Sequence, residues 1–151
     1  MEWLGQLGYA LPLAMGAVGS SLGIGRAGMA AAGAWAKEAR EGRPLTFLYI
    51  ALVGMPLSQT IYGLVIMIAL LSGRVFDVEY ASANAGALFS VGLAVGLGQL
   101  FSAWMQGSIG AAGIRAMSEG QNRPFVFCII AMGIAETAGL FAAFLMFLML
   151  P

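Results

Sequence analysis

The amino-acid sequence predicts an all-α membrane protein whose four transmembrane helices form two tandem helical hairpins that assemble into a ring. Composition is the first reason, because 60% of the 151 residues are hydrophobic and only 9% are charged, whereas soluble domains carry about 25% charged residues. The second reason is that the apolar residues form four long runs. The third is that the two halves of the chain repeat each other.

Several kinds of partner and site are not expected. Basic and acidic residues balance at seven each, so nothing favours nucleic acid as a partner. The chain has no histidine, which is the commonest protein ligand of transition metals and the usual base at neutral pH. The one cysteine, Cys128, is expected to pack within an apolar segment. No Gly-Lys-Ser/Thr follows the glycines, so we expect this chain to bind no nucleotide.

Four segments are apolar enough to cross a bilayer as helices, which takes about 20 residues. They are 5–36, 45–72, 83–117 and 125–150, so that residues 1–80 form the first hairpin and 81–151 the second. Pro44 and Pro124 stand where the second and fourth helices are expected to begin, because a helix start tolerates the missing N–H of proline. The first run follows Glu2 rather than a basic segment and exceeds the roughly 7–15 apolar residues of a secretory signal, so we expect a mature span.

The basic residues predict which side of the membrane each loop faces. Loops 37–44 and 115–124 are basic, and they contain Lys37, Arg40, Arg43, Arg115 and Arg123. In the middle loop Arg74 stands against Asp77 and Glu79. Because basic loops stay in the cytoplasm, we expect loops 37–44 and 115–124 to be cytoplasmic and both termini to lie outside.

A shift of about 80 residues aligns the two halves over a whole hairpin. The aligned segments are Ala31-Ala32-Gly33 with Ala111-Ala112-Gly113, Arg43-Pro44 with Arg123-Pro124, Phe47 with Phe127, and Ile50-Ala51 with Ile130-Ala131. Because this register keeps helix, loop and proline together, it favours a duplicated hairpin over chance similarity between Ala/Gly-rich helices. The two basic loops face the same side, so the repeat is parallel, unlike the inverted repeats of many secondary transporters.

Glycine distinguishes the odd helices from the even ones. The first and third spans carry glycines along most of their length, including the GxxxG pairs Gly19/Gly23 and Gly92/Gly96, which let helix backbones approach closely in lipid. The second and fourth spans are dense in Leu, Ile, Phe and Met. A single close contact between the two helices of each hairpin would explain one GxxxG pair per hairpin. Glycines spread along the helix favour a ring with thin helices inside and bulky helices outside.

Glu136 is the candidate functional residue, because a carboxyl at bilayer depth costs at least ~3 kcal/mol. It lies about twelve residues past Pro124, near mid-membrane for a rise of 1.5 Å per residue. The polar residues Gln106, Ser58 and Gln59 fall at comparable depth on two other helices. A spacing of three and four residues places Met55, Gln59 and Tyr62 on one helix face.

These groups supply an all-oxygen shell for a hard cation. The shell consists of one carboxylate, two amide oxygens, one hydroxyl and a main-chain carbonyl, which Pro56 deprives of its usual helical partner. One negative charge suits a monovalent ion such as Na⁺, since divalent ions generally take more carboxylates. The alternative is that the glutamines and Ser58 only form hydrogen bonds between helices and bind no ion.

The repeat gives each chain one such site. In the 80-residue register Glu136 aligns with Pro56, and Gln106 aligns with Arg26, so the first hairpin has no carboxyl of its own. Arg26 is expected to extend toward the cytoplasm, face the ring interior or bond to carbonyls. It is not expected in the cation site, because its fixed positive charge repels a cation.

These motifs together resemble the proteolipid (c or K) subunits of rotary V/A-type ATPases, in particular the sodium-coupled type with a duplicated hairpin. The resembling segments are 23–33, 56–63, Met105-Gln106-Gly107 and Ala135-Glu136-Thr137, and the likeness covers essentially the whole chain. The departures are Leu57-Ser58, where the family often has Gly-Thr, and Arg26 in the inner helix. Serine keeps the hydroxyl oxygen at that position.

The resemblance implies a non-catalytic rotor subunit in a bacterial or archaeal plasma membrane. Its homo-oligomeric ring would turn in the lipid against a stator (a/I-type) subunit that supplies an arginine, with a central-stalk subunit at the cytoplasmic loops. The residues that it assigns to Na⁺ binding are Glu136, Gln106, Gln59, the Ser58 hydroxyl and the Met55 carbonyl. Tyr62 would hydrogen-bond to Glu136, and Thr137 would stand beside it without binding the ion.

Other interpretations stay open. The same rotor carrying H⁺ would need only Glu136, and the glutamines would then be incidental. A stand-alone small transporter or pore would act without ATPase partners, and it predicts a second intramembrane charge or an inverted repeat. A purely structural proteolipid would leave Glu136 unexplained.

Overall fold

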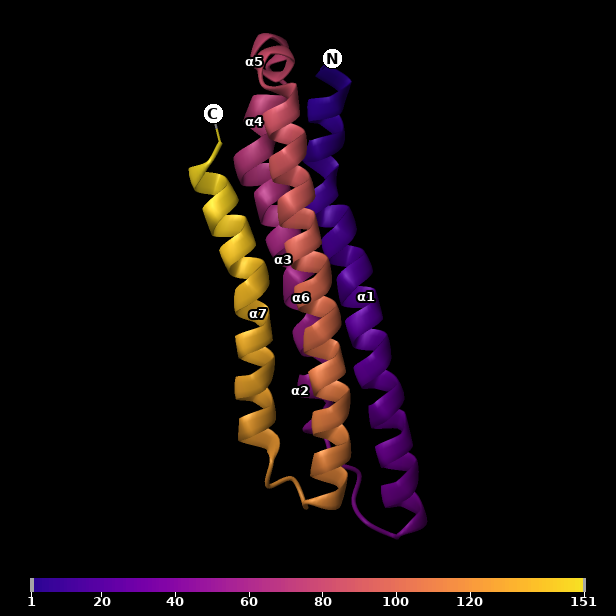
Figure 1. Cartoon of the computed structure of the whole chain (residues 1–151). Coiled ribbons are helices and arrows are strands. Elements are labelled where there is room, and N and C mark those ends of the chain that lie inside the picture. The colour runs from indigo at the N-terminus through magenta and orange to yellow at the C-terminus, as the bar shows by residue number, and fades with distance from the viewer. Residues whose placement is uncertain (1, 151) are drawn as a thin grey trace.

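The computed structural model describes residues 2–150 and, over these residues, is a bundle of helices without strands (Figure 1). Three helices are long: α1 (Glu2–Arg40), α6 (Ala85–Glu119) and α7 (Phe125–Leu148). The remaining span is built from consecutive short pieces, namely α2 (Tyr49–Gly54), the 3₁₀ turn η1 (Met55–Leu57), α3 (Ser58–Val65), the π-helical η2 (Ile66–Leu71) and α4 (Ser72–Val75). A short α5 (Val78–Ala83) connects it to α6.

Four segments of the described chain are long and apolar enough to cross a membrane. They are Trp3–Arg40, Tyr49–Ala69, Ala85–Glu119 and Phe125–Leu148. This confirms the predicted class of an all-α membrane protein with four transmembrane helices. Both chain ends and α5 lie at one end of the bundle, and the α1–α2 and α6–α7 loops lie at the other (Figure 1).

The helix ends at the loop side differ from the predicted bounds. Helix α1 continues to Arg40 because the Glu38 carboxylate is buried and accepts hydrogen bonds from the Thr46 N–H at 2.9 Å, the Thr46 hydroxyl at 2.8 Å and the Tyr49 hydroxyl at 2.7 Å. These bonds fold the connecting loop back along the last turn of α1. Helix α2 therefore begins at Tyr49, and Pro44 lies in the loop, whereas Pro124 is the N-cap of α7.

The middle connection is more helical than predicted. Asp77 is the N-cap of α5, where its side chain accepts a hydrogen bond from the Tyr80 N–H at 3.0 Å. A side-chain oxygen at this position satisfies one of the free N–H groups at a helix start. The predicted connection between the second and third spans, 73–82, thus contains most of α4 and of α5.

Helices α1 and α6 pack against each other through their glycines, as predicted for the thin helices. A Cβ added at Gly92 would overlap the backbone of Gly8, and one added at Gly107 would overlap the backbone of Gly23. Such contacts bring two backbones together in lipid, where dispersion contacts replace the hydrophobic effect as the driving force. The α1–α6 pair is therefore the central helix pair of the bundle, and the other two spans pack against it.

The core has two apolar layers with a polar layer between them. The layer near the loops contains Tyr49, Leu52, Ile114, Met117 and Met132, and the other contains Ile66, Leu71, Leu88, Val91 and Val95. Gln59, Gln99, Ser102 and Gln106 are also buried, and their contacts converge on the middle of α7. The outer face of α7 is apolar, with Phe127 75% exposed and Ile134 66% exposed, as expected for a lipid-facing surface.

Candidate ion-binding site

Glu136 projects from the middle of α7, and each of its carboxylate oxygens has a donor from another helix. The Tyr62 hydroxyl on α3 donates to Oε1 at 2.8 Å, as the family resemblance implies. The Gln106 side-chain amide on α6 donates to Oε2 at 3.3 Å and to the Met132 carbonyl at the same distance. The carboxylate is half-buried and is held between three helices.

Met55, Ser58 and Gln59 form a second group of oxygen atoms. Pro56 cannot donate to the helix ladder, and the chain there tightens into the 3₁₀ turn η1. The Ser58 hydroxyl lies 3.0 Å from the Met55 carbonyl and 2.7 Å from Gln59 Oε1. The Met55 carbonyl also accepts from the Ser58 N–H, so it is bonded within its own turn rather than free.

Ser102 on α6 joins the two groups. Its hydroxyl accepts a hydrogen bond from Gln59 Nε2 at 3.0 Å and donates to the Ala135 carbonyl at 2.9 Å. Because Nε2 of Gln59 is turned to Ser102, Oε1 of the same amide is turned to Ser58. The sequence prediction missed Ser102. The sequence did offer one indication, because Ser102 precedes Gln106 by four residues and this spacing places both side chains on one face of α6.

Gln99 extends this polar face of α6 by one further turn. It is fully buried, and its Nε2 donates to the Gly139 carbonyl at 3.0 Å. A Cβ added at Gly139 would lie 3.1 Å from the Ser102 hydroxyl and 3.2 Å from Gln99 Oε1, so glycine lets α7 approach. Within the described residues, Oε1 of both Gln99 and Gln106 is buried without a hydrogen-bond partner. The amide that donates to Glu136 thus carries a buried oxygen with no hydrogen-bond partner.

Thr137 does not join these contacts. Its hydroxyl donates to the Ile134 carbonyl at 2.6 Å, and the residue is exposed on the surface of α7. One step along a helix turns a side chain by about 100°, which takes Thr137 away from the face that carries Glu136.

The first hairpin holds a polar contact of its own near Pro56, the position aligned with Glu136. The Ser20 hydroxyl donates to the Pro56 carbonyl at 2.5 Å, and the Thr60 hydroxyl donates to Ser20 at 2.8 Å. Arg26 lies elsewhere: its guanidinium donates to the Ser108 hydroxyl at 2.6 Å and stands 4.8 Å from the centre of the Trp104 ring. Arg26 thus lies on the surface shared by α1 and α6, where it bonds to a hydroxyl rather than to the carbonyls that were one of the expected partners.

The fold and the site define a membrane proteolipid with a single carboxylate held between helices at the middle of the bundle. A family model for the ATP synthase C subunit matches residues 7–70 and 89–149. The chain belongs to this family, whose members form rings. The two matched ranges correspond to the two halves of the chain.

A curated relative agrees with this placement. The chain is 28% identical over 148 residues to the A-type ATP synthase subunit K of Methanocaldococcus jannaschii. The alignment covers 97% of this chain and 61% of the relative, so the chain spans about three fifths of the length of the protein that it matches.

Proposed function

We propose that the chain is a rotor-ring subunit of a rotary A/V-type ATPase and carries Na⁺ by reversible binding at Glu136. The observation that carries this proposal is a carboxylate bonded by Tyr62 and Gln106 from two other helices, next to an amide oxygen of Gln106 that has no donor. A cation bound beside the carboxylate would give this buried oxygen a partner. Family membership and the subunit K relative support the rotor role.

The proposed ligands are five oxygen donors. They are the Glu136 carboxylate, Oε1 of Gln59 and of Gln106, the Ser58 hydroxyl and the Met55 carbonyl. The Met55 carbonyl and Gln59 Oε1 each lie within hydrogen-bonding distance of the Ser58 hydroxyl. One carboxylate and one Na⁺ give a neutral site, which removes the cost of a bare charge facing lipid.

Binding and release require only side-chain movements. Without the ion, the carboxylate is held by Tyr62 and Gln106, so it does not need to fold inward or outward between cycles. Binding turns the Gln106 amide so that its oxygen, rather than Nε2, faces the ion. Release occurs when an arginine of the stator subunit approaches Glu136 and competes for the carboxylate, and the half-buried position of Glu136 on α7 leaves it accessible from outside the bundle.

The proposed orientation follows from the charges of the loops. The α1–α2 and α6–α7 loops lie at one end of the bundle, and the basic residues of both loops favour a cytoplasmic position for this end. A central-stalk subunit binds there, and both termini face outside. The two halves act as one unit with one ion site, because the position aligned with Glu136 is Pro56.

The same rotor carrying H⁺ is the second candidate. The observation in its favour is that Tyr62 and Gln106 already satisfy both carboxylate oxygens without a cation. A protonated Glu136 is also neutral, so its passage through the lipid is equally free of a bare charge.

Carbodiimide labelling of the purified ring separates the two ions. The reagent attacks the protonated carboxyl, so bound Na⁺ should slow the labelling of Glu136 at constant pH. We expect protection by millimolar or lower Na⁺, weaker protection in Gln106→Ala and no labelling at this position in Glu136→Gln. Glu119→Gln, at the exposed end of α6, is the matched control and should behave like the native chain.

Two other outcomes have distinct meanings. Labelling that follows pH alone and ignores Na⁺ would make the rotor a proton carrier. Native labelling in Glu136→Gln would show that another carboxyl reacts, and it would contradict the carrier role of Glu136.

A further inference from the structure

Helix α1 supplies none of the proposed ion ligands, yet it packs directly on the segment that carries three of the five. That segment is the turn η1 with the start of α3, and it bears Met55, Ser58 and Gln59. A Cβ added at Gly16 would lie 2.7 Å from the Gln59 carbonyl oxygen. One added at Gly23 would lie 2.8 Å from the Pro56 side chain. Glycine at these two positions therefore lets α1 rest on both the turn and α3.

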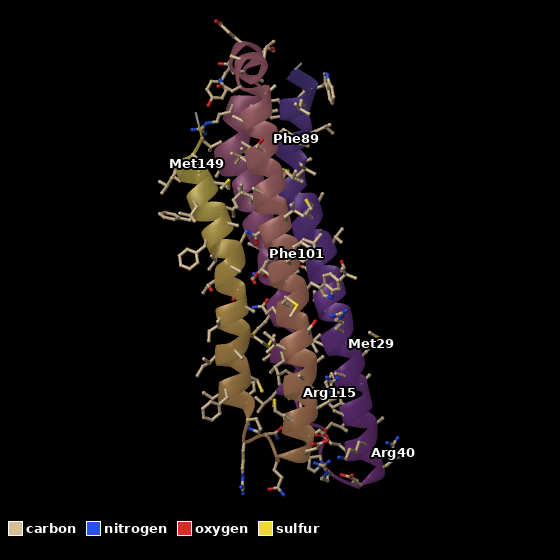
Figure 2. All side chains as sticks on the ribbon, in the orientation of Figure 1. Met29, Arg40, Phe89, Phe101, Arg115 and Met149 are labelled. Atoms are coloured by element: carbon tan, nitrogen blue, oxygen red, sulfur yellow. The ribbon has the colours of Figure 1, made fainter. Side chains whose placement is uncertain are left out.

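Ser20 lies between the two glycines and on the same face of α1, because it stands four residues after one and three before the other. It is only 2% exposed, and its hydroxyl donates to the Pro56 carbonyl at 2.5 Å. The adjacent Gly19 packs on the backbone of Leu100. The bond from α1 to the turn therefore lies near the depth of Phe101, in the middle of the bundle (Figure 2).

Thr60 fixes the direction in which the Ser20 hydroxyl donates. The Thr60 hydroxyl donates to the Ser20 oxygen at 2.8 Å, and a serine hydroxyl has one hydrogen, which is left for Pro56. Thr60 stands four residues after Pro56, and a threonine within a helix can bond to the carbonyl four residues before it. Ser20 is inserted between these two groups. It thus takes the place of a local contact with one from another helix.

The turn η1 has few hydrogen bonds of its own. Pro56 has no N–H, so the helix ladder is interrupted at this point, and a 3₁₀ turn has poorer hydrogen-bond geometry than an α-helix. The Met55 carbonyl accepts both from the Ser58 N–H and, at 3.0 Å, from the Ser58 hydroxyl. Because Met55 and Ser58 flank Pro56, a shift of Pro56 moves both of these proposed ligand oxygens.

We propose that Ser20 is a positioning residue of the ion site, which holds the turn η1 so that the Met55 carbonyl and the Ser58 hydroxyl face the ion. The inference rests on the proposed Na⁺ function and deepens it, since it makes the first helix a determinant of ion affinity. Ser20 is not itself a ligand, because its hydroxyl is engaged by Pro56 and Thr60. Without its bond the turn is held only by its local contacts, and a shell whose oxygens are less fixed binds the ion more weakly.

Carbodiimide labelling of Glu136 in the purified ring of the full chain tests the proposal with two readouts. The first is the Na⁺ concentration that half-protects Glu136 at constant pH, and the second is the pH profile of labelling without Na⁺. We expect Ser20→Ala to raise the first several-fold and to leave the second as in the native ring, because Tyr62 and Gln106 hold the carboxylate and neither bonds to Ser20. Ser21→Ala, on the exposed face of α1, is the matched control and should match the native ring in both.

The other outcomes have separate meanings. A half-protecting concentration in Ser20→Ala within twofold of the native value would overturn the proposal. A pH profile that shifts together with the Na⁺ dependence would also overturn it, because it would show a general loosening of the bundle. A native ring that Na⁺ does not protect would contradict the proposed Na⁺ function itself, and the role of Ser20 would fall with it.

Ser20→Cys decides if Ser20→Ala does not assemble. The thiol nearly keeps the size of the side chain but is a weaker hydrogen-bond donor, so the half-protecting Na⁺ concentration should again rise while the pH profile stays unchanged. Native behaviour of Ser20→Cys in both readouts would then overturn the proposal.

Discussion

Replacing Ser102 by alanine tests whether the structure orients the ion ligands through this hydroxyl. Ser102 is only 3% exposed, and it is the acceptor for Nε2 of the fully buried Gln59. The variant leaves this amide donor without a partner in the interior. A buried donor that loses its partner costs ~1–3 kcal/mol.

Gln59 has one way to avoid that cost, which is to turn its amide. The turn takes Oε1 away from Ser58 and points Nε2 toward the proposed ligands, so the oxygen needed by Na⁺ is lost from its place. Either outcome weakens Na⁺ binding. A loss of ~1.4 kcal/mol corresponds to a tenfold weaker affinity, and we expect an effect of about that size.

The assay is the Na⁺ concentration that half-protects Glu136 from carbodiimide in the purified ring. Ser102→Cys should lie between the native chain and Ser102→Ala, because a thiol is a weaker hydrogen-bonding group. Ser108→Ala is the matched control, since its hydroxyl faces Arg26 rather than the ion site. A half-protecting concentration within twofold of the native value in Ser102→Ala would refute the orienting role.

Three further predictions follow from single contacts. Tyr62→Phe removes the 2.8 Å bond to Glu136 and should weaken half-protection by Na⁺ several-fold, since one hydrogen bond contributes ~0.5–1.5 kcal/mol. Gly107→Leu should abolish the native oligomer on native gels, because a side chain there overlaps the backbone of α1. Glu38→Gln should accelerate trypsin cleavage after Arg40, because the amide cannot accept all three hydrogen bonds that the carboxylate receives from Thr46 and Tyr49.

The position of Gln106 beside Glu136 could be expected from the sequence, because the depth of each residue in the membrane can be counted along its helix. The Tyr62 contact was expected from the family resemblance instead. Counting residues from Pro124 placed Glu136 near the middle of its helix, and the same count placed Gln106 beside it. Depth does not give direction around the helix axis. Thr137 shares the depth of Glu136 but points outward, where it bonds to the Ile134 carbonyl.

Ser102 and the end of α1 could not be predicted, for different physical reasons. A serine in a Gly/Ala-rich helix carries no charge to mark it, and its role depends on the orientation of Gln59 on another helix. Glu38 belongs to a charged stretch that is typical of a loop. Its burial depends on Tyr49 and Thr46 folding back onto α1, and this is a tertiary contact rather than a local preference.

Equilibrium binding of radioactive Na⁺ to the purified ring tests the carrier role of Glu136 most directly. We predict one Na⁺ bound per chain, although each chain has two hairpins, and none in Glu136→Gln. We also predict weaker binding at low pH, because a protonated Glu136 cannot bind the ion. The absence of saturable Na⁺ binding in the native ring would contradict a sodium site at Glu136, and so would binding that Glu136→Gln leaves unchanged.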